Sequence, residues 1–147
     1  MTPEEPMPAP SPRIDGCLET AIYVDDLARA AGFYEKTLGL SPMYSDERLV
    51  AFDCGPRSVL LLFLRGATLE TVRLPGGEIP PHDGCGKLHF ALAAPDEDIE
   101  PWERRLQAEG VAIEARMQWP RGGRSLYFRD PDGNLVEIAS PGLWANY

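Results

Sequence analysis

The chain repeats one order of segments, and this duplication constrains its fold more than any other feature. A strand-like run at 19–24 is followed by helical spacing that ends at Gly39 and then by three further strand-like runs. The same order returns after residue 86, where a second helical stretch ends at Gly110. A shared order of strand, helix, glycine stop and hairpin indicates an internal repeat. We therefore predict an α+β fold built from two βαβββ modules.

Within each copy, the local signals place the elements. In the first copy, Asp25 and Asp26 offer a helix N-cap, and Pro42 prevents the helix from resuming. Apolar residues recur between them at helical spacing: Leu27, Ala30, Ala31, Tyr34 and Leu38. The remaining strands are predicted at 43–44, 49–53 and 58–64, and in the second copy at 88–93, 112–116, 125–129 and 134–139.

The composition of the flanking segments predicts the domain boundaries. Residues 1–16 are rich in proline and are expected to form a disordered or extended tail. The modules are predicted at 17–65 and 87–140, with a Gly- and Pro-rich linker at 66–86. Residues 141–147 form a C-terminal tail whose aromatic side chains predict that it docks on its own chain or across a dimer.

Charge and cysteine content exclude several classes of protein. The formal net charge is −9, which argues against non-specific binding to nucleic acid or to an anionic membrane. No apolar run approaches the length of a membrane span, and no secretory signal opens the chain. The three cysteines, Cys17, Cys54 and Cys85, are an odd number at no metal-finger spacing. We expect a cytoplasmic protein with free thiols.

An acidic residue interrupts the last predicted strand. Because strand side chains alternate, Glu137 shares a face with Leu135 and Ala139 and lies either on a solvated surface or at the floor of a site. Aligning the two copies sets Glu19 opposite His89, each second in its opening strand. Two carboxylates and an imidazole that converge among apolar neighbours need a compensating charge, which a divalent cation supplies. The alternative is a hydrogen-bonded His89 with two solvated or paired glutamates.

Four phrases of the sequence resemble the vicinal oxygen chelate superfamily, which includes glyoxalases, fosfomycin and bleomycin resistance proteins and extradiol dioxygenases. They lie at 19–27, 33–40, 89–92 and 128–137, and the resemblance covers roughly residues 17–140. It implies two βαβββ modules that form a cupped mixed sheet around a central cavity with a divalent metal ion. It also implies a homodimer that takes a small-molecule substrate.

Carried over to this chain, the resemblance makes Glu19, His89 and Glu137 the metal ligands. Two positions depart from the family pattern: Glu19 stands where His or Gln is usual, and Leu61 stands where glyoxalase I has a fourth ligand. Two carboxylates and one imidazole suit Fe, Mn, Ni or Zn. The catalytic candidates are Glu137 and Glu19, and Glu19 could instead leave the metal and serve as a base.

Two classes of function follow from the resemblance. The first is a metal-dependent enzyme that acts on a small substrate with vicinal oxygens, as a lyase, an isomerase or a ring-cleaving dioxygenase. The second is a metal-free binding protein of the bleomycin-resistance type. The retained ligand positions favour the enzyme.

Three further residues are candidates for contact with a substrate. Tyr23 shares a strand face with Glu19, although a strand tyrosine is also a common core or rim residue. Arg121 and Arg124 flank two glycines in a predicted loop and could receive an anionic substrate. A plain solvated loop is the alternative for both arginines.

Overall fold

The computed structural model describes residues 6–147, and its elements follow the predicted repeat. The first module contains β1 (Glu19–Val24), α1 (Leu27–Gly32), the π-helical turn η1 (Phe33–Thr37), β2 (Ser41–Ser45), β3 (Leu49–Asp53) and β4 (Val59–Leu64). The second contains β7 (His89–Ala93), the 3₁₀ turn η2 (Asp96–Asp98), α2 (Ile99–Ala108), β8 (Ala115–Gln118), β9 (Arg124–Arg129) and β10 (Leu135–Ala139).

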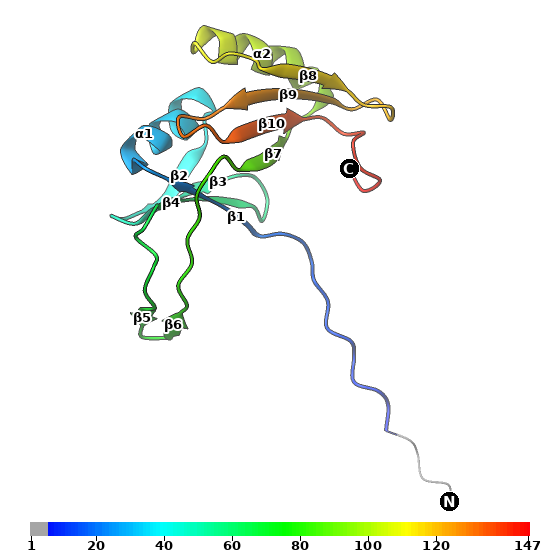
Figure 1. The fold of residues 1–147 in the computed structure, drawn as a ribbon. Helices are drawn as coiled ribbons and strands as arrows, with labels where there is room; N and C mark the ends of the chain where they lie inside the picture. Colours follow the sequence, from blue (N-terminus) through cyan, green and yellow to red (C-terminus); the bar gives the residue numbers. More distant parts are fainter. Residues whose placement is uncertain (1–5) are drawn as a thin grey trace, which may run out of the picture.

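Each module forms its own four-stranded mixed sheet, as Figure 1 shows. The strand orders are β1-β4-β3-β2 and β7-β10-β9-β8, so the opening strand of each module lies at an edge. It pairs in parallel with the last strand of its module, and the other pairs are antiparallel. The duplication and the α+β class are thereby confirmed. Within one chain, the two sheets do not join into a closed cup.

The linker and the strand before Arg124 differ from the prediction. Residues 66–86 contain a hairpin, β5 (Val72–Leu74) and β6 (Gly77–Ile79), which projects from the body in Figure 1. The glycine-rich turn between these short strands allows the chain to reverse there. Strand β8 begins at Ala115 rather than at residue 112. Before it, the backbone N–H of Val111 donates to the Leu106 carbonyl of α2 and closes the end of that helix.

The two ends of the chain behave differently. Residues 6–18 have no regular secondary structure and extend away from the body, and residues 1–5 of the predicted tail lie outside the described residues. At the C-terminus, the Tyr147 hydroxyl donates to the Ala139 carbonyl at 2.8 Å, so this tail docks on its own chain. Within residues 6–147, every helix is too short or too polar to cross a lipid bilayer.

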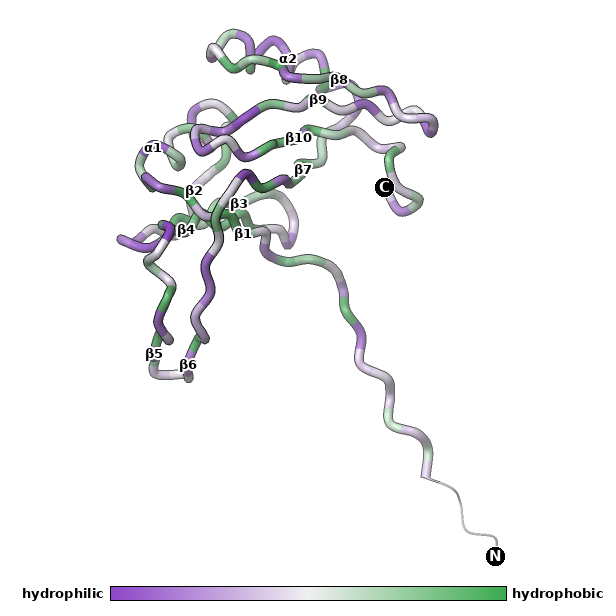
Figure 2. The backbone as a smooth tube through the Cα atoms, in the orientation of Figure 1, coloured by the Kyte–Doolittle hydropathy of each residue, from purple (hydrophilic) through white to green (hydrophobic). Residues whose placement is uncertain are grey.

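A single hydrophobic core joins the modules. Figure 2 shows that hydrophobic residues occur in the strands of both sheets, and one buried cluster contains residues from both. The ring of Tyr34 lies 6.2 Å from Phe52 of the first sheet and 6.3 Å from Phe90 of the second. Its hydroxyl donates to the buried carboxylate of Asp130 at 2.7 Å.

This packing decides which faces of the sheets remain open. Ile22 on β1 and Val136 on β10 belong to the shared core, so the helical segment around Tyr34 lies between the inner faces of the two sheets. Side chains alternate along each strand, so the neighbouring residues lie on the opposite faces. We call these opposite faces the open faces. They point away from each other within one chain.

Candidate metal centre

His89 and Glu137 meet on the open face of the second sheet. The parallel register of β7 and β10 sets His89 beside Leu135, two residues before Glu137. The imidazole Nε2 lies 3.4 Å from Glu137 Oε1. The carboxylate is only 6% exposed, whereas half of the imidazole surface is exposed. The structure thus brings together two of the three predicted ligands.

The hydrogen bond on the other imidazole nitrogen determines which atoms face each other. His89 Nδ1 lies 2.9 Å from the Leu135 carbonyl oxygen, which can only accept, so Nδ1 carries the proton. A neutral imidazole then points its Nε2 lone pair at the Glu137 carboxylate, an arrangement that repels unless a cation or a proton lies between them. Two ligand atoms bound to one ion at about 2.1 Å lie about 3.0 to 3.4 Å apart, so the residues fit a divalent metal.

A hydrogen-bond relay holds the other oxygen of the carboxylate. Ser125 Oγ, on β9, donates to Glu137 Oε2 at 2.5 Å, and Trp119 Nε1 donates to Ser125 Oγ at 2.8 Å. An indole N–H can only donate, so Ser125 must use its single proton toward Glu137. The relay leaves Oε1 directed toward His89. Ser125 is not among the residues predicted from the sequence, although its position opposite Ala139 places it on this face.

Tyr127 completes this part of the open face. It lies directly opposite Glu137 in the antiparallel β9–β10 pair, and its ring stacks near that of His89 with centroids 6.3 Å apart. Burial raises the pKa of Tyr127, and the negative charge of Glu137 raises it further. Tyr127 therefore remains a protonated hydrogen-bond donor at neutral pH. The alternation of strand side chains was the signal that could have identified it.

Glu19 does not join this pair within one chain. It is exposed at the start of the edge strand β1, on the open face of the other sheet. Within residues 6–147, no three His, Cys, Asp or Glu side chains come together in a way that could hold a metal ion. The position of the absent fourth ligand, Leu61, pairs with Ala21 beside Glu19.

The weaker substrate candidates have other partners. The Tyr23 hydroxyl lies 2.7 Å from Nδ1 of His82, a loop histidine that is half-buried beside it. Arg124 lies on the α2 side of its sheet, opposite the His89–Glu137 face, and binds carboxylates on η2 and α2. These carboxylates belong to Asp96 and Glu100, whose pKa values are lowered by the hydrogen bonds from Arg124. Arg124 therefore does not lie where the predicted basic rim requires it. Arg121 remains exposed in the β8–β9 turn.

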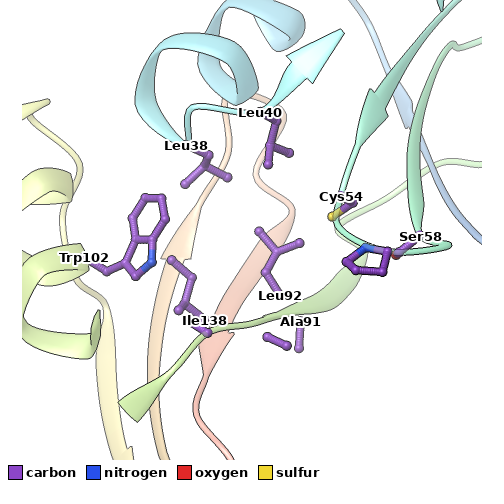
Figure 3. A pocket seen from close by; sticks show the side chains of 11 residues that line it. Leu38, Leu40, Cys54, Ser58, Ala91, Leu92, Trp102 and Ile138 are labelled. Carbon is purple, nitrogen blue, oxygen red and sulfur yellow. The ribbon is translucent and has the colours of Figure 1, made fainter. Parts of the chain in front are cut away.

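A separate cavity of about 410 Å³ lies between the modules, and Figure 3 shows its apolar lining. It is bounded by Leu38 and Leu40 after η1, by Trp102 of α2 and by the edge of β7. Cys54 also lines it, and burial raises the pKa of its thiol. Neither the histidine nor the two glutamates of the predicted site line this cavity. The candidate metal centre is therefore the open face.

Comparison with known proteins identifies the family of the chain. The family model described as Glyoxalase/Bleomycin resistance protein/Dioxygenase superfamily matches residues 16–138. The uncharacterized protein YraH of Bacillus subtilis is 30% identical over 128 residues, which cover 82% of this chain and 94% of YraH. The glutathione transferase FosA of Serratia marcescens is 29% identical over 120 residues, which cover 80% of this chain and 74% of FosA.

A solved structure is also similar. The lactoylglutathione lyase of Agrobacterium tumefaciens superposes with a TM-score of 0.81 at 35% sequence identity. The match covers 90% of this chain and 98% of the lyase chain.

Proposed function

The chain belongs to the Glyoxalase/Bleomycin resistance protein/Dioxygenase superfamily, and we propose that it is a metal-dependent enzyme that acts on a small substrate with two neighbouring oxygens. The observation that carries the proposal is the pair formed by His89 Nε2 and Glu137 Oε1, with the imidazole proton held on Nδ1. The named activities of similar proteins, a lactoylglutathione lyase and a glutathione transferase, support an enzyme over a metal-free binding protein.

We further propose that Glu19 of a second copy completes the ligand set. Glu19 and the His89–Glu137 pair lie on open faces that point away from each other, so one chain cannot bring them together. Both β1 and β7 are edge strands with one side unpaired. The unpaired backbone groups of either edge are able to accept a parallel or antiparallel strand of a second copy. A two-fold homodimer in which β1 of one copy meets β7 of the other forms two equivalent sites.

The roles of the side chains follow from this arrangement. His89, Glu137 and Glu19 of the second copy would hold a divalent ion, of which Mn, Fe, Ni and Zn suit nitrogen and carboxylate ligands. Such an ion supplies Lewis-acid stabilisation of negative charge on two adjacent substrate oxygens. Tyr127, directly opposite Glu137, would offer its protonated hydroxyl to a substrate bound at this face. Glu19 is the carboxylate suited to proton abstraction, because it lacks the relay that holds Glu137.

Metal analysis of variants tests the ligand set and the dimer together. Protein purified without a polyhistidine tag should retain a divalent metal, and Glu19→Gln and His89→Ala should each lose it. When equal amounts of the two variants are unfolded, mixed and refolded, each mixed dimer contains one intact site, so about a quarter of the metal content of the parent should return. Metal retention that stays absent in the mixture would refute the shared site, and a parent that binds no metal after reconstitution would refute the enzyme.

The same samples test the role of the relay-held carboxylate. Glu137→Gln should lose the metal, because a neutral amide is a weaker ligand than a carboxylate. Glu114→Gln is the matched control, since Glu114 pairs with Arg129 at the surface instead. It should retain the metal content of the parent.

A further inference from the structure

The surroundings of the His89–Glu137 pair are small and apolar. Strand alternation and register place six such residues on the open face of the second sheet: Ala91, Ala93, Ala115, Met117, Leu135 and Ala139. Tyr127 is the aromatic residue among them. A ligand held at the pair would therefore lie against alanine, leucine and methionine side chains.

The open face of the first sheet, which the proposed dimer sets across the site, has the same character. Beyond Glu19, strands β1 and β4 present Ala21, Val59 and Leu61. At the far end, Tyr23 stacks on Phe63 with ring centroids 5.8 Å apart. Nothing in these two strands offers a positive charge to a substrate.

The linker closes that far end. The His82 ring packs edge-on against Phe63, with centroids 4.6 Å apart, and binds the Tyr23 hydroxyl. The backbone of Gly84 lies so close to the Tyr23 ring that an added Cβ would stand 2.4 Å from it. An aromatic wall, rather than an open and solvated groove, therefore bounds the first sheet.

Positive charge is scarce on both open faces. Among the strand positions that face outward in the two sheets, Arg129 is the one lysine or arginine. Its Nε and Nη2 donate to the two carboxylate oxygens of Glu114 at 2.8 and 3.0 Å, and Nη1 donates to a backbone carbonyl. A bidentate pair of this kind leaves the guanidinium little capacity for a second anion.

We propose that the site takes a neutral substrate with an apolar body, aryl or branched alkyl, and two adjacent oxygens, and that it disfavours bodies that carry a phosphonate or carboxylate. This inference rests on the proposed function. Apolar walls stabilise an apolar body through burial, whereas an anionic group placed against them loses hydration without a cation to replace it.

Two cations outside the strands mark where an anionic body could otherwise bind. Lys87 lies two residues before His89 and packs toward Gly133 at the end of the sheet. Arg121 is exposed in the β8–β9 turn. Substitutions of Lys87 and Arg121, which we call the rim cations, distinguish an anion bound by these two side chains from one bound against the apolar walls.

Three hydroxamic acids test the proposal on metal-loaded protein. Each presents two adjacent oxygens: acetohydroxamic acid has almost no body, benzohydroxamic acid has an apolar body, and 4-phosphonobenzohydroxamic acid has a charged one. By calorimetry, we expect benzohydroxamic acid to bind at least about tenfold more tightly than acetohydroxamic acid, because ring burial removes roughly 100 Å² of apolar surface from water. It should also bind at least about tenfold more tightly than the phosphono compound, whose charged group loses hydration at the apolar walls without a cation to replace it. Ala91→Lys, which adds a cation beside His89 at an exposed position, should narrow the gap to the phosphono compound.

The outcomes separate the two proposals. If the protein holds metal and the phosphono compound binds as tightly as benzohydroxamic acid or more tightly, the neutral substrate class is refuted. If Lys87→Gln or Arg121→Gln then removes that affinity, the rim is the anion site. If metal-loaded protein binds none of the three, the chelating site itself is refuted, and the proposed function fails with it.

Discussion

Substitution of Ser125 by alanine should weaken both the fold and the proposed metal centre. The Ser125 hydroxyl is almost fully buried, donates to Glu137 at 2.5 Å and accepts from Trp119 at 2.8 Å. A hydrogen bond to a charged group contributes about 1.5 to 3 kcal/mol, and the half-buried indole N–H left without its acceptor costs up to about 1 kcal/mol more. We expect Ser125→Ala to lower the free energy of unfolding by about 2 to 4 kcal/mol in urea titrations.

The same change should alter metal binding. Without the relay, the Glu137 carboxylate is free to rotate, and loss of such outer hydrogen bonds lowers metal affinity by about 10- to 100-fold. The measurement is competition of reconstituted protein against a chromophoric chelator. Ser140→Ala is the matched control, because Ser140 is equally buried but bonds to Asp96 and to the Arg124 backbone. It should lose stability and keep the metal affinity of the parent.

Three results would refute this reasoning. If Ser125→Ala binds metal with the affinity of the parent, the relay does not position the carboxylate. If Ser140→Ala loses as much affinity as Ser125→Ala, the loss reflects general destabilisation of the β9–β10 pair rather than a role of Ser125. An unchanged free energy of unfolding in Ser125→Ala would show that the hydrogen bond to Glu137 contributes nothing.

Two further substitutions test contacts away from the candidate metal centre. In urea titrations, Tyr34→Phe should lower the free energy of unfolding by about 1.5 to 3 kcal/mol, because the buried carboxylate of Asp130 loses a hydrogen-bond donor. Tyr44→Phe is the control: it removes an exposed hydrogen bond of the same type and should lower the free energy of unfolding by less than about 1 kcal/mol. Equal losses would contradict the burial argument. Arg124→Gln should be less stable than the parent near pH 7, because hydrogen bonds from Arg124 lower the pKa of its two carboxylate partners. Their contribution is present above the unfolded-state pKa of about 4 and is lost as pH falls through the lower folded-state values. The difference should therefore shrink as pH falls below about 4, and a difference independent of pH would refute it.

Much of the fold could be predicted because the relevant signals are local. Alternation in β1 and β10 and the helical spacing before Gly39 define which residues of each element are apolar on one side. The turn that begins at Asp130 contains residues that reverse the chain. The β5–β6 hairpin escaped prediction because its strands have three residues each, which is too short for alternation to be recognised.

The candidate site, too, could be predicted only in part. His89 and Glu137 were predicted together, since each carries a polar side chain at a strand position whose face the alternation defines. Ser125 and Tyr127 were missed, although they share that face, because a serine and a tyrosine on a strand are unremarkable until their distances to Glu137 are known. Arg124 was assigned to a loop rim, whereas β9 begins at this residue and turns it toward α2.

By itself, the sequence determined the two βαβββ modules and which face of each strand carries Glu19, His89 and Glu137. It could not determine where those faces point, because periodicity is a property of one element and carries no information about its neighbours. The tertiary structure decided this through long-range packing: Tyr34 and its helical turn lie between both sheets, against Phe52 and Phe90. Burial of that apolar segment turns the two open faces outward and separates Glu19 from the residues it was predicted to join.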